Sequence, residues 1–226
     1  MSWRGTRIAA AGAVVVLGLS TLAACGGSDE KPTPTPAATT SAPAAAPKGY
    51  PTGSPVGLDY AKPGDSFQLG ESGTVAWQPP KATAVGALRI SVSAIQRTTF
   101  AKSFRDWKVA DEVKGYAPYF VQASVANVGP TNLGAQTVPL YGETSADTLL
   151  EPSTFATTFK PCTPSTFPQK FTTGQVAVVC MVYLVPDGGQ LTGVTFRPTE
   201  GFTPITWSGD AQTIGAEPTP SATITQ

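Results

Sequence analysis

YFVQASVANV, residues 119–128, alternates apolar side chains with small or polar ones. The runs LRISVS (88–93) and QVAVVCMVYLV (175–185) repeat this period of two. Val, Tyr and Phe favour strands, and the Gly, Pro and Asn residues between the runs favour turns, so each run predicts a half-buried β-strand. Shorter strands are predicted at 74–77, 137–141, 154–158, 195–197 and 205–207.

These strands predict a single domain over residues 66–209, which is long enough to bury a core of ordinary size. Seven to nine short strands separated by turn signals predict an antiparallel, immunoglobulin-like β-sandwich. Strands and helices do not alternate along the chain, so a parallel sheet is not expected.

The N-terminus has the layout of a secretory signal peptide. A basic stretch with Arg4 and Arg7 precedes an uncharged apolar run from residue 8, and small residues then lead to Cys25. A permanent transmembrane helix is the alternative, but the run is about 17 residues long and a span needs about 20. The sequence LAAC (22–25) resembles the lipobox of bacterial lipoproteins. The resemblance implies cleavage after residue 24 and lipid on the Cys25 sulfur, which would hold the protein on the outer face of the cytoplasmic membrane.

Two segments outside the predicted domain are rich in Pro, Thr and Ala. Residues 25–65 contain KPTPTPAATTSAPAAAPKG, and residues 210–226 end in EPTPSATITQ. Such compositions bury too little apolar surface to offset the entropy lost on ordering. We therefore expect a disordered linker between Cys25 and the domain, and a disordered C-terminal tail.

Charge and cysteine content limit the function. Of 15 basic side chains, Arg4 and Arg7 leave with the signal peptide, so 13 remain against 15 acidic ones. This balance argues against a general nucleic-acid-coating protein, which carries a strong basic excess. Cys162 and Cys180 remain as an even pair, and in an exported protein such a pair indicates a disulfide; two free buried thiols are the alternative. Closing a loop of roughly 17 residues contributes roughly 3 kcal/mol.

The chain contains no histidine, which removes the commonest general base and the commonest metal ligand. A Ser-His-Asp hydrolase, a Cys-His transferase and a histidine-based metal site are therefore excluded. With the cysteines committed, no soft-metal ligand remains. Asp106, Asp111 and Glu112 lie in one polar connection without the pairing of a glycosidase, and we interpret them as solvated loop charges. We expect no enzymatic activity, no cofactor and no metal.

Seven short blocks of the domain carry a family resemblance. They are YAPYFV (116–121), VANVG (125–129), VPLY (138–141), FKPC (159–162), CMVYLVP (180–186), LTGVTFRP (191–198) and PITW (204–207). Together they resemble a family of mostly uncharacterised actinobacterial lipoproteins with a telokin-like, immunoglobulin-related domain, over most of residues 86–207. The resemblance implies an extracellular binding or scaffold module and no known reaction.

The segment RTTFAKSFRDWK (97–108) is the most unusual local feature. Phe100, Phe104 and Trp107 follow helical spacing and would share one face of one or two helical turns, with cations such as Arg105 around them. Aromatic and Arg residues are enriched in binding hot spots, so these four residues are the candidate contacts for a partner. The alternative is a short element that plugs one end of the sandwich. Trp77 and Trp207 are interpreted as packing residues, with glycan stacking as the alternative.

These observations favour a surface-tethered, non-enzymatic lipoprotein. The lipid on Cys25 would attach it to the membrane, and the sandwich would present edges and loops to a protein or cell-wall partner. The alternative is a solute- or glycan-binding lipoprotein, which needs a concave pocket with a few convergent polar groups.

Overall fold

The three long alternating runs form the three long strands of the protein, β3 (Gly86–Arg97), β4 (Ala117–Asn127) and β7 (Val176–Val185). They are seen in a computed structural model that describes residues 43–186 and 188–215. β4 lies between β3 and β7 and pairs with both in the antiparallel sense. Along β4 the buried Tyr119, Val121 and Val125 alternate with the more exposed Gln122 and Ser124, so the period of two seen in the sequence directs one side of the strand into the core.

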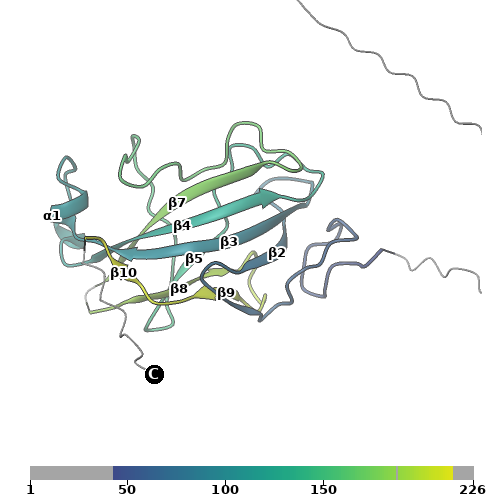
Figure 1. Cartoon of the computed structure of the whole chain (residues 1–226), viewed down its shortest axis with the longest axis horizontal. Coiled ribbons are helices and arrows are strands. Elements are labelled where there is room, and N and C mark those ends of the chain that lie inside the picture. Colours follow the sequence, from purple (N-terminus) through teal and green to yellow (C-terminus); the bar gives the residue numbers. More distant parts are fainter. Residues whose placement is uncertain (1–42, 187, 216–226) are drawn as a thin grey trace, which may run out of the picture. The chain divides into compact units, whose positions relative to one another are not determined.

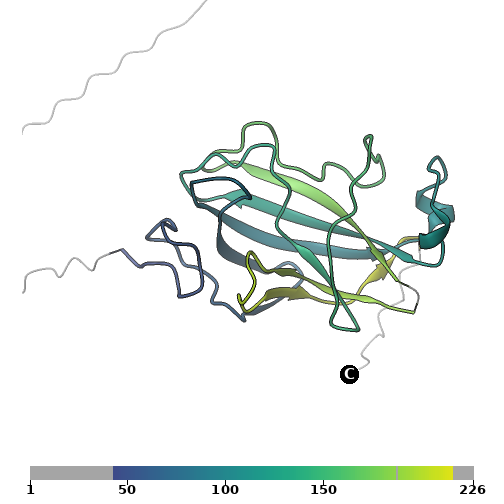
Figure 2. The ribbon, with the colours of Figure 1, turned by 180° about the vertical axis from the view of Figure 1, so that it is seen from behind.

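The strands form two sheets of five. In the first sheet, β2 (Ser72–Trp77) and β10 (Gln212–Thr213) both pair with β3, next to β4 and β7. The second sheet has the order β1 (Ser66–Gln68), β9 (Ile205–Ser208), β8 (Leu191–Phe196), β5 (Tyr141–Thr144) and β6 (Leu149–Leu150). Figures 1 and 2 show the sheets as two layers. The predicted β-sandwich is confirmed.

The sandwich differs from the prediction in its short strands. The described residues contain ten strands rather than seven to nine, because β1, β6 and β10 have only two or three residues each and give no periodic signal. Two of these short strands are parallel to their neighbours, β1 to β9 and β10 to β3. Both lie beside the ends of the domain sequence, where the chain joins a sheet edge without a hairpin that would impose the antiparallel direction.

The core fills the space between the two layers. Its largest fully buried side chains include Trp207, Tyr183 and Phe196. Each buried aromatic side chain removes about 150 to 250 Å² from water, which contributes about 4 to 6 kcal/mol by area. The buried Asn127 is satisfied within this core: its amide donates to the carbonyl oxygens of Thr131 and Phe171, at 2.8 and 2.7 Å.

The end of the predicted linker is wrong. Part of the segment from Ala46 onward packs against the sandwich, and Tyr60 and Ala61 are only 7% exposed. The hydroxyl of Tyr50 donates to the carbonyl oxygen of Ala61 at 2.8 Å, and its ring contacts that of Phe202 with centroids 5.3 Å apart. Two tyrosines thus cover one end of the core in a segment whose average composition resembles a disordered chain. The signal peptide, Cys25 and the rest of the linker lie outside the described residues.

The C-terminal boundary and two predicted strands also need correction. Residues 210–215 were expected to be disordered, but β10 pairs with β3 and the Ile214 N–H donates to the Arg97 carbonyl oxygen. At 137–141 the strand begins only at Tyr141, since Thr137 forms an isolated bridge with Thr166. Residues 154–158 form no strand; they belong to a loop that covers the outer face of the first sheet.

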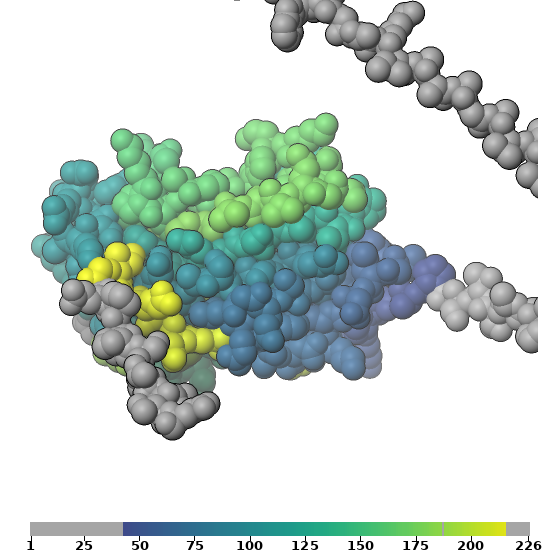
Figure 3. Space-filling model, viewed as in Figure 1, coloured from purple at the N-terminus to yellow at the C-terminus, as the bar shows by residue number. Residues whose placement is uncertain are grey.

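The described part of the chain begins at one end of the long axis of the domain, and the helix α1 (Phe100–Ser103) lies at the other. In Figure 3 the first described residues form the purple and blue end, and the helix lies within the teal end. A 3₁₀ turn, η1 (Asp111–Val113), follows between α1 and β4.

Candidate functional site

The predicted aromatic segment forms a single helical turn. α1 begins after Thr99, whose hydroxyl oxygen accepts a hydrogen bond from the Lys102 backbone N–H at 3.2 Å. The helix ends at Ser103, and the Trp107 N–H then donates to the Phe104 carbonyl oxygen in a following turn. Phe100 and Phe104 share one side, as predicted, with ring centroids 5.0 Å apart. Trp107 is held by the turn rather than by a second turn of helix.

The three aromatic side chains differ in exposure. Phe104 is 5% exposed, whereas Phe100 and Trp107 are partly buried. Phe104 contacts Phe120, which projects from the outer face of β4, with centroids 6.2 Å apart. The packing interpretation therefore applies to Phe104, while Phe100 and Trp107 keep surface that a partner can contact.

Two further aromatic residues complete this group, and sequence reasoning missed them. Phe155 and Phe159 stack on each other at 4.5 Å and lie within 5.4 Å of the Trp107 ring centroid. We call the set the outer aromatic cluster: Phe100, Phe104, Trp107, Phe120, Phe155 and Phe159. The signal that could have located the second pair is Cys162, three residues after Phe159, because a disulfide to a strand must bring its segment onto the sheet.

The Cys162–Cys180 disulfide is present, as predicted, with Cα atoms 5.1 Å apart. It joins the loop that carries Phe155 and Phe159 to β7. The Cys180 N–H donates to the Pro164 carbonyl oxygen at 2.8 Å, and the Ser153 N–H donates to the Val182 carbonyl oxygen at 2.7 Å. The covalent bond and these hydrogen bonds hold the loop over the outer face of the first sheet, where it shields Phe120 from water.

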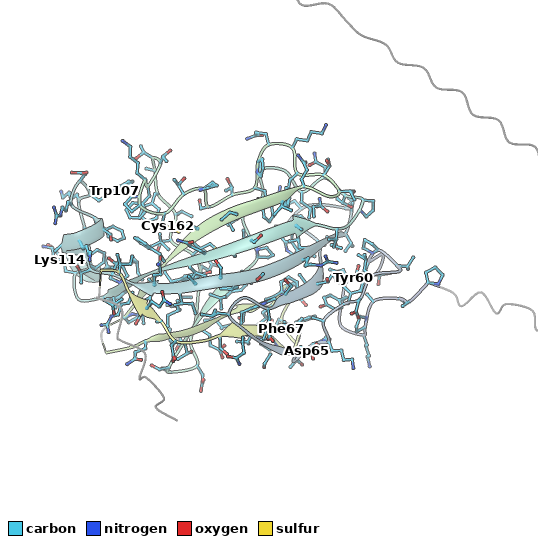
Figure 4. The ribbon with its side chains drawn as sticks, viewed as in Figure 1. Tyr60, Asp65, Phe67, Trp107, Lys114 and Cys162 are labelled. Carbon is cyan, nitrogen blue, oxygen red and sulfur yellow. A yellow bond between two sulfur atoms is a disulfide. The ribbon has the colours of Figure 1, made fainter. Side chains whose placement is uncertain are left out.

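Charged side chains surround the outer aromatic cluster. Arg105 is exposed, and its Nε atom donates to the Ala101 carbonyl oxygen at 3.0 Å. Lys102 donates to the carbonyl oxygen of Ile214, next to β10. Lys114 forms an ion pair with Asp111. We call the exposed surface formed by Phe100, Arg105, Trp107, Lys108 and Lys160 the α1 face. Figure 4 shows Trp107, Cys162 and Lys114 at this end of the domain and Tyr60 at the other.

A groove of about 430 Å³ opens beside Trp107. Its walls come from two segments. One is the turn after α1, and the other is the loop between β6 and β7 that carries Phe155 and Phe159, which we call the covering loop. Its lining residues include Asp106, Trp107, Lys108, Thr157, Thr158 and Lys160. Most of the lining residues are polar or charged, and Trp107 supplies the aromatic surface of the groove.

The other two tryptophans of the described chain pack inside it. Trp77 is 6% exposed and Trp207 is fully buried, and the Trp207 indole N–H donates to the Glu71 carbonyl oxygen at 3.2 Å. This favours the packing interpretation of both. A hollow of about 460 Å³ reaches Trp77, but four prolines form much of its wall and only a small part of the ring is exposed.

Burial raises the pKa of three tyrosines. The pKa of Tyr60 rises to about 12, and those of Tyr50 and Tyr183 rise further above their ordinary value. Within residues 43–186 and 188–215, no three Asp, Glu or Cys side chains cluster as metal ligands. No helix in the described part of the chain is long and apolar enough to cross a membrane.

No protein-family model and no curated protein matches this sequence. A search of solved structures finds MPT63, a secreted protein from Mycobacterium tuberculosis, with a TM-score of 0.43 and 14% identity. The match covers 64% of this chain and 96% of that one. A likeness of this degree transfers no activity, partner or site residue to this chain.

Proposed function

We propose that this protein is an exported, non-enzymatic binding module, tethered to the membrane by lipid on Cys25, whose α1 face contacts a partner in the cell envelope. The proposal rests chiefly on Trp107. Its ring is held between the turn after α1 and the covering loop, yet part of it is exposed beside Lys108 and Lys160. A large aromatic side chain held rigidly at a surface loses little entropy on binding and is a frequent interface anchor.

The energetics of the cluster support this assignment. Phe104, Phe120 and Phe159 already fill the interior of the outer aromatic cluster at 5% exposure or less. The exposed parts of Phe100 and Trp107 therefore add little to the burial that stabilises the fold. Exposed aromatic surface next to cations is the composition of a contact surface rather than of a structural plug.

The export and anchoring parts of the proposal rest on the sequence LAAC at 22–25 and on the disulfide, which forms in oxidising compartments. Metabolic labelling with an alkyne fatty acid tests the anchor. We expect label on the membrane-bound parent protein, and neither label nor membrane retention in a Cys25→Ser variant. Equal labelling of both proteins would contradict the lipid site.

Site-specific photo-crosslinking tests the binding face. A photoreactive amino acid replaces Lys108 in the full-length protein in living cells. A matched variant carries it at Lys62, an exposed lysine two residues from Tyr60, which lies at the other end of the domain (Figure 4). We expect one defined adduct from position 108, loss of that adduct when Trp107→Ala is added, and no matching adduct from position 62. No adduct at 108, or the same adduct at both positions, would overturn the proposal. A Phe104→Ala variant is expected to lose folding stability, which marks it as a packing control and not a test of binding.

A further inference from the structure

The groove beside Trp107 contains polar side chains that the fold does not use. Lys108, Lys160 and Asp106 form no ion pair or hydrogen bond with any other described residue, and neither do the hydroxyl groups of Thr157 and Thr158. All five residues are exposed. Two segments about 50 residues apart in the sequence thus bring free donors and acceptors to one groove. Packing within the described chain gives no reason for their convergence.

The indole of Trp107 adds an oriented surface to these groups. Phe155 and Phe159 meet the ring at interplanar angles of 74° and 70°, which fixes its position. The indole N–H has no hydrogen-bond partner among the described residues and is not one of their buried unsatisfied atoms, so it reaches solvent. The groove is therefore lined by an aromatic ring of fixed position, whose N–H remains free to donate.

The charges in the groove select among ligand classes. Lys108 and Lys160 provide two positive charges and Asp106 one negative charge, which leaves a net positive groove. The single negative charge of one carboxylate matches the net charge of the groove. A doubly charged phosphate exceeds it and is repelled more strongly by Asp106. A sugar ring presents C–H bonds on one face, which suit an aromatic ring, and hydroxyl groups at its edge, which suit Asp106 and the threonine hydroxyls. The volume of about 430 Å³ lies within the range of small-molecule sites.

We propose that this groove binds an acidic sugar unit. The carboxylate of the sugar faces Lys108 and Lys160, its ring lies on Trp107, and its hydroxyl groups bond Asp106 and the two threonines. The inference rests on the proposed function, since it names the ligand chemistry of the same α1 face. It places the partner among acidic glycans of the envelope.

A matched pair of disaccharides tests the inference. Cellobiouronic acid and cellobiose differ only at one C6, which is a carboxylate in the acid and a hydroxymethyl group in cellobiose. Each is titrated into ¹⁵N-labelled full-length protein while the Trp107 indole N–H signal is followed. We expect a saturable shift with cellobiouronic acid and at least tenfold weaker binding of cellobiose. Lys160→Gln should weaken binding of the acid about tenfold, the cost of one charge-assisted hydrogen bond, and leave cellobiose unaffected. Lys62→Gln is the matched control and should change neither.

The opposite results are equally defined. If neither sugar shifts the Trp107 signal, if both bind equally, or if Lys62→Gln acts like Lys160→Gln, the acidic-sugar site is overturned. These outcomes are separate from the photo-crosslinking result. A defined protein adduct at position 108 together with no sugar binding would leave the proposed function standing and refute this inference alone.

Discussion

The hydroxyl of Tyr183 donates a hydrogen bond to the carbonyl oxygen of Leu140 at 2.9 Å, and both residues are buried. Tyr183 belongs to β7 in the first sheet, and Leu140 directly precedes β5 in the second. The bond therefore joins the two layers at the point where the chain enters the second sheet. A buried carbonyl oxygen that loses its partner keeps the full cost of its dehydration.

Tyr183→Phe is expected to lower the free energy of unfolding by about 1 to 2 kcal/mol, because it leaves the Leu140 oxygen unpaired. Urea denaturation followed by tryptophan fluorescence measures the loss. Tyr141→Phe is the matched control, since Tyr141 is half-buried and its hydroxyl has no hydrogen-bond partner among the described residues, and it should change stability by less than about 0.5 kcal/mol. Equal effects of the two substitutions would contradict the role of the Tyr183 bond.

The long strands could be predicted from the sequence because their inward side chains keep a strict period of two. Leu88, Ile90 and Val92 alternate on β3 as expected and are fully buried. Cys162 and Cys180 could be paired because no other cysteine of the domain competes for them. In both cases the residues that make the tertiary contact can be recognised from the sequence alone.

The two irregular segments that cover the sandwich, one with Tyr50 and Tyr60 and the other with Phe155 and Phe159, could not be predicted in this way. Tyr50 and Tyr60 pack through isolated side chains in a Pro-rich context, without any period to mark them. Phe155 and Phe159 lie on a loop that is held to β7 by a disulfide and single backbone hydrogen bonds rather than by regular strand pairing. The Trp107 groove depends on both the turn after α1 and this loop, so only its Trp107 side could be identified in advance.

Removing the disulfide tests how the covering loop is held. Cys162→Ala combined with Cys180→Ala is expected to lower the free energy of unfolding by about 3 kcal/mol. The reason is that the disulfide closes a loop in the unfolded chain and so lowers the entropy of the unfolded state. Reduction with dithiothreitol should lower the urea midpoint of the parent protein to that of the double variant. It should leave the urea midpoint of the variant unchanged. A parent protein whose urea midpoint does not respond to reduction would contradict the prediction.

Truncation tests the revised N-terminal boundary. A chain that begins at residue 66 loses Tyr50, Tyr60 and Ala61, whose contacts close one end of the core. We expect it to be less stable than a chain that begins at residue 43 by more than about 3 kcal/mol, in line with the loss of large buried side chains. Differential scanning calorimetry compares the two. Equal melting temperatures would show that the segment is dispensable.

Alkaline pH should destabilise the fold because it deprotonates Tyr50 and Tyr60. Burial raises the pKa of Tyr60 from 10.0 to about 12 and raises that of Tyr50 as well. A raised pKa means that the folded state holds the proton more tightly, so this contribution to stability is complete below pH 10 and is lost as the pH rises toward 12. Urea midpoints between pH 8 and 11.5 should be constant at first and then fall. Tyr60→Phe should reduce the slope of that fall, and an unchanged slope would exclude Tyr60 as a cause.

The placement of the N-terminal segment and Trp107 at opposite ends of the domain has a mechanical consequence. The described chain enters at one end of the long axis, Trp107 lies at the other, and β3, β4 and β7 run between them (Figure 1). A protein held through its N-terminal side and pulled by a ligand at Trp107 is loaded along these strands. The hydrogen bonds of an antiparallel pair are perpendicular to the strands, so such a load strains many of them together in shear instead of opening them one at a time. If the tether and the binding face are as proposed, the three long strands resist such a load together.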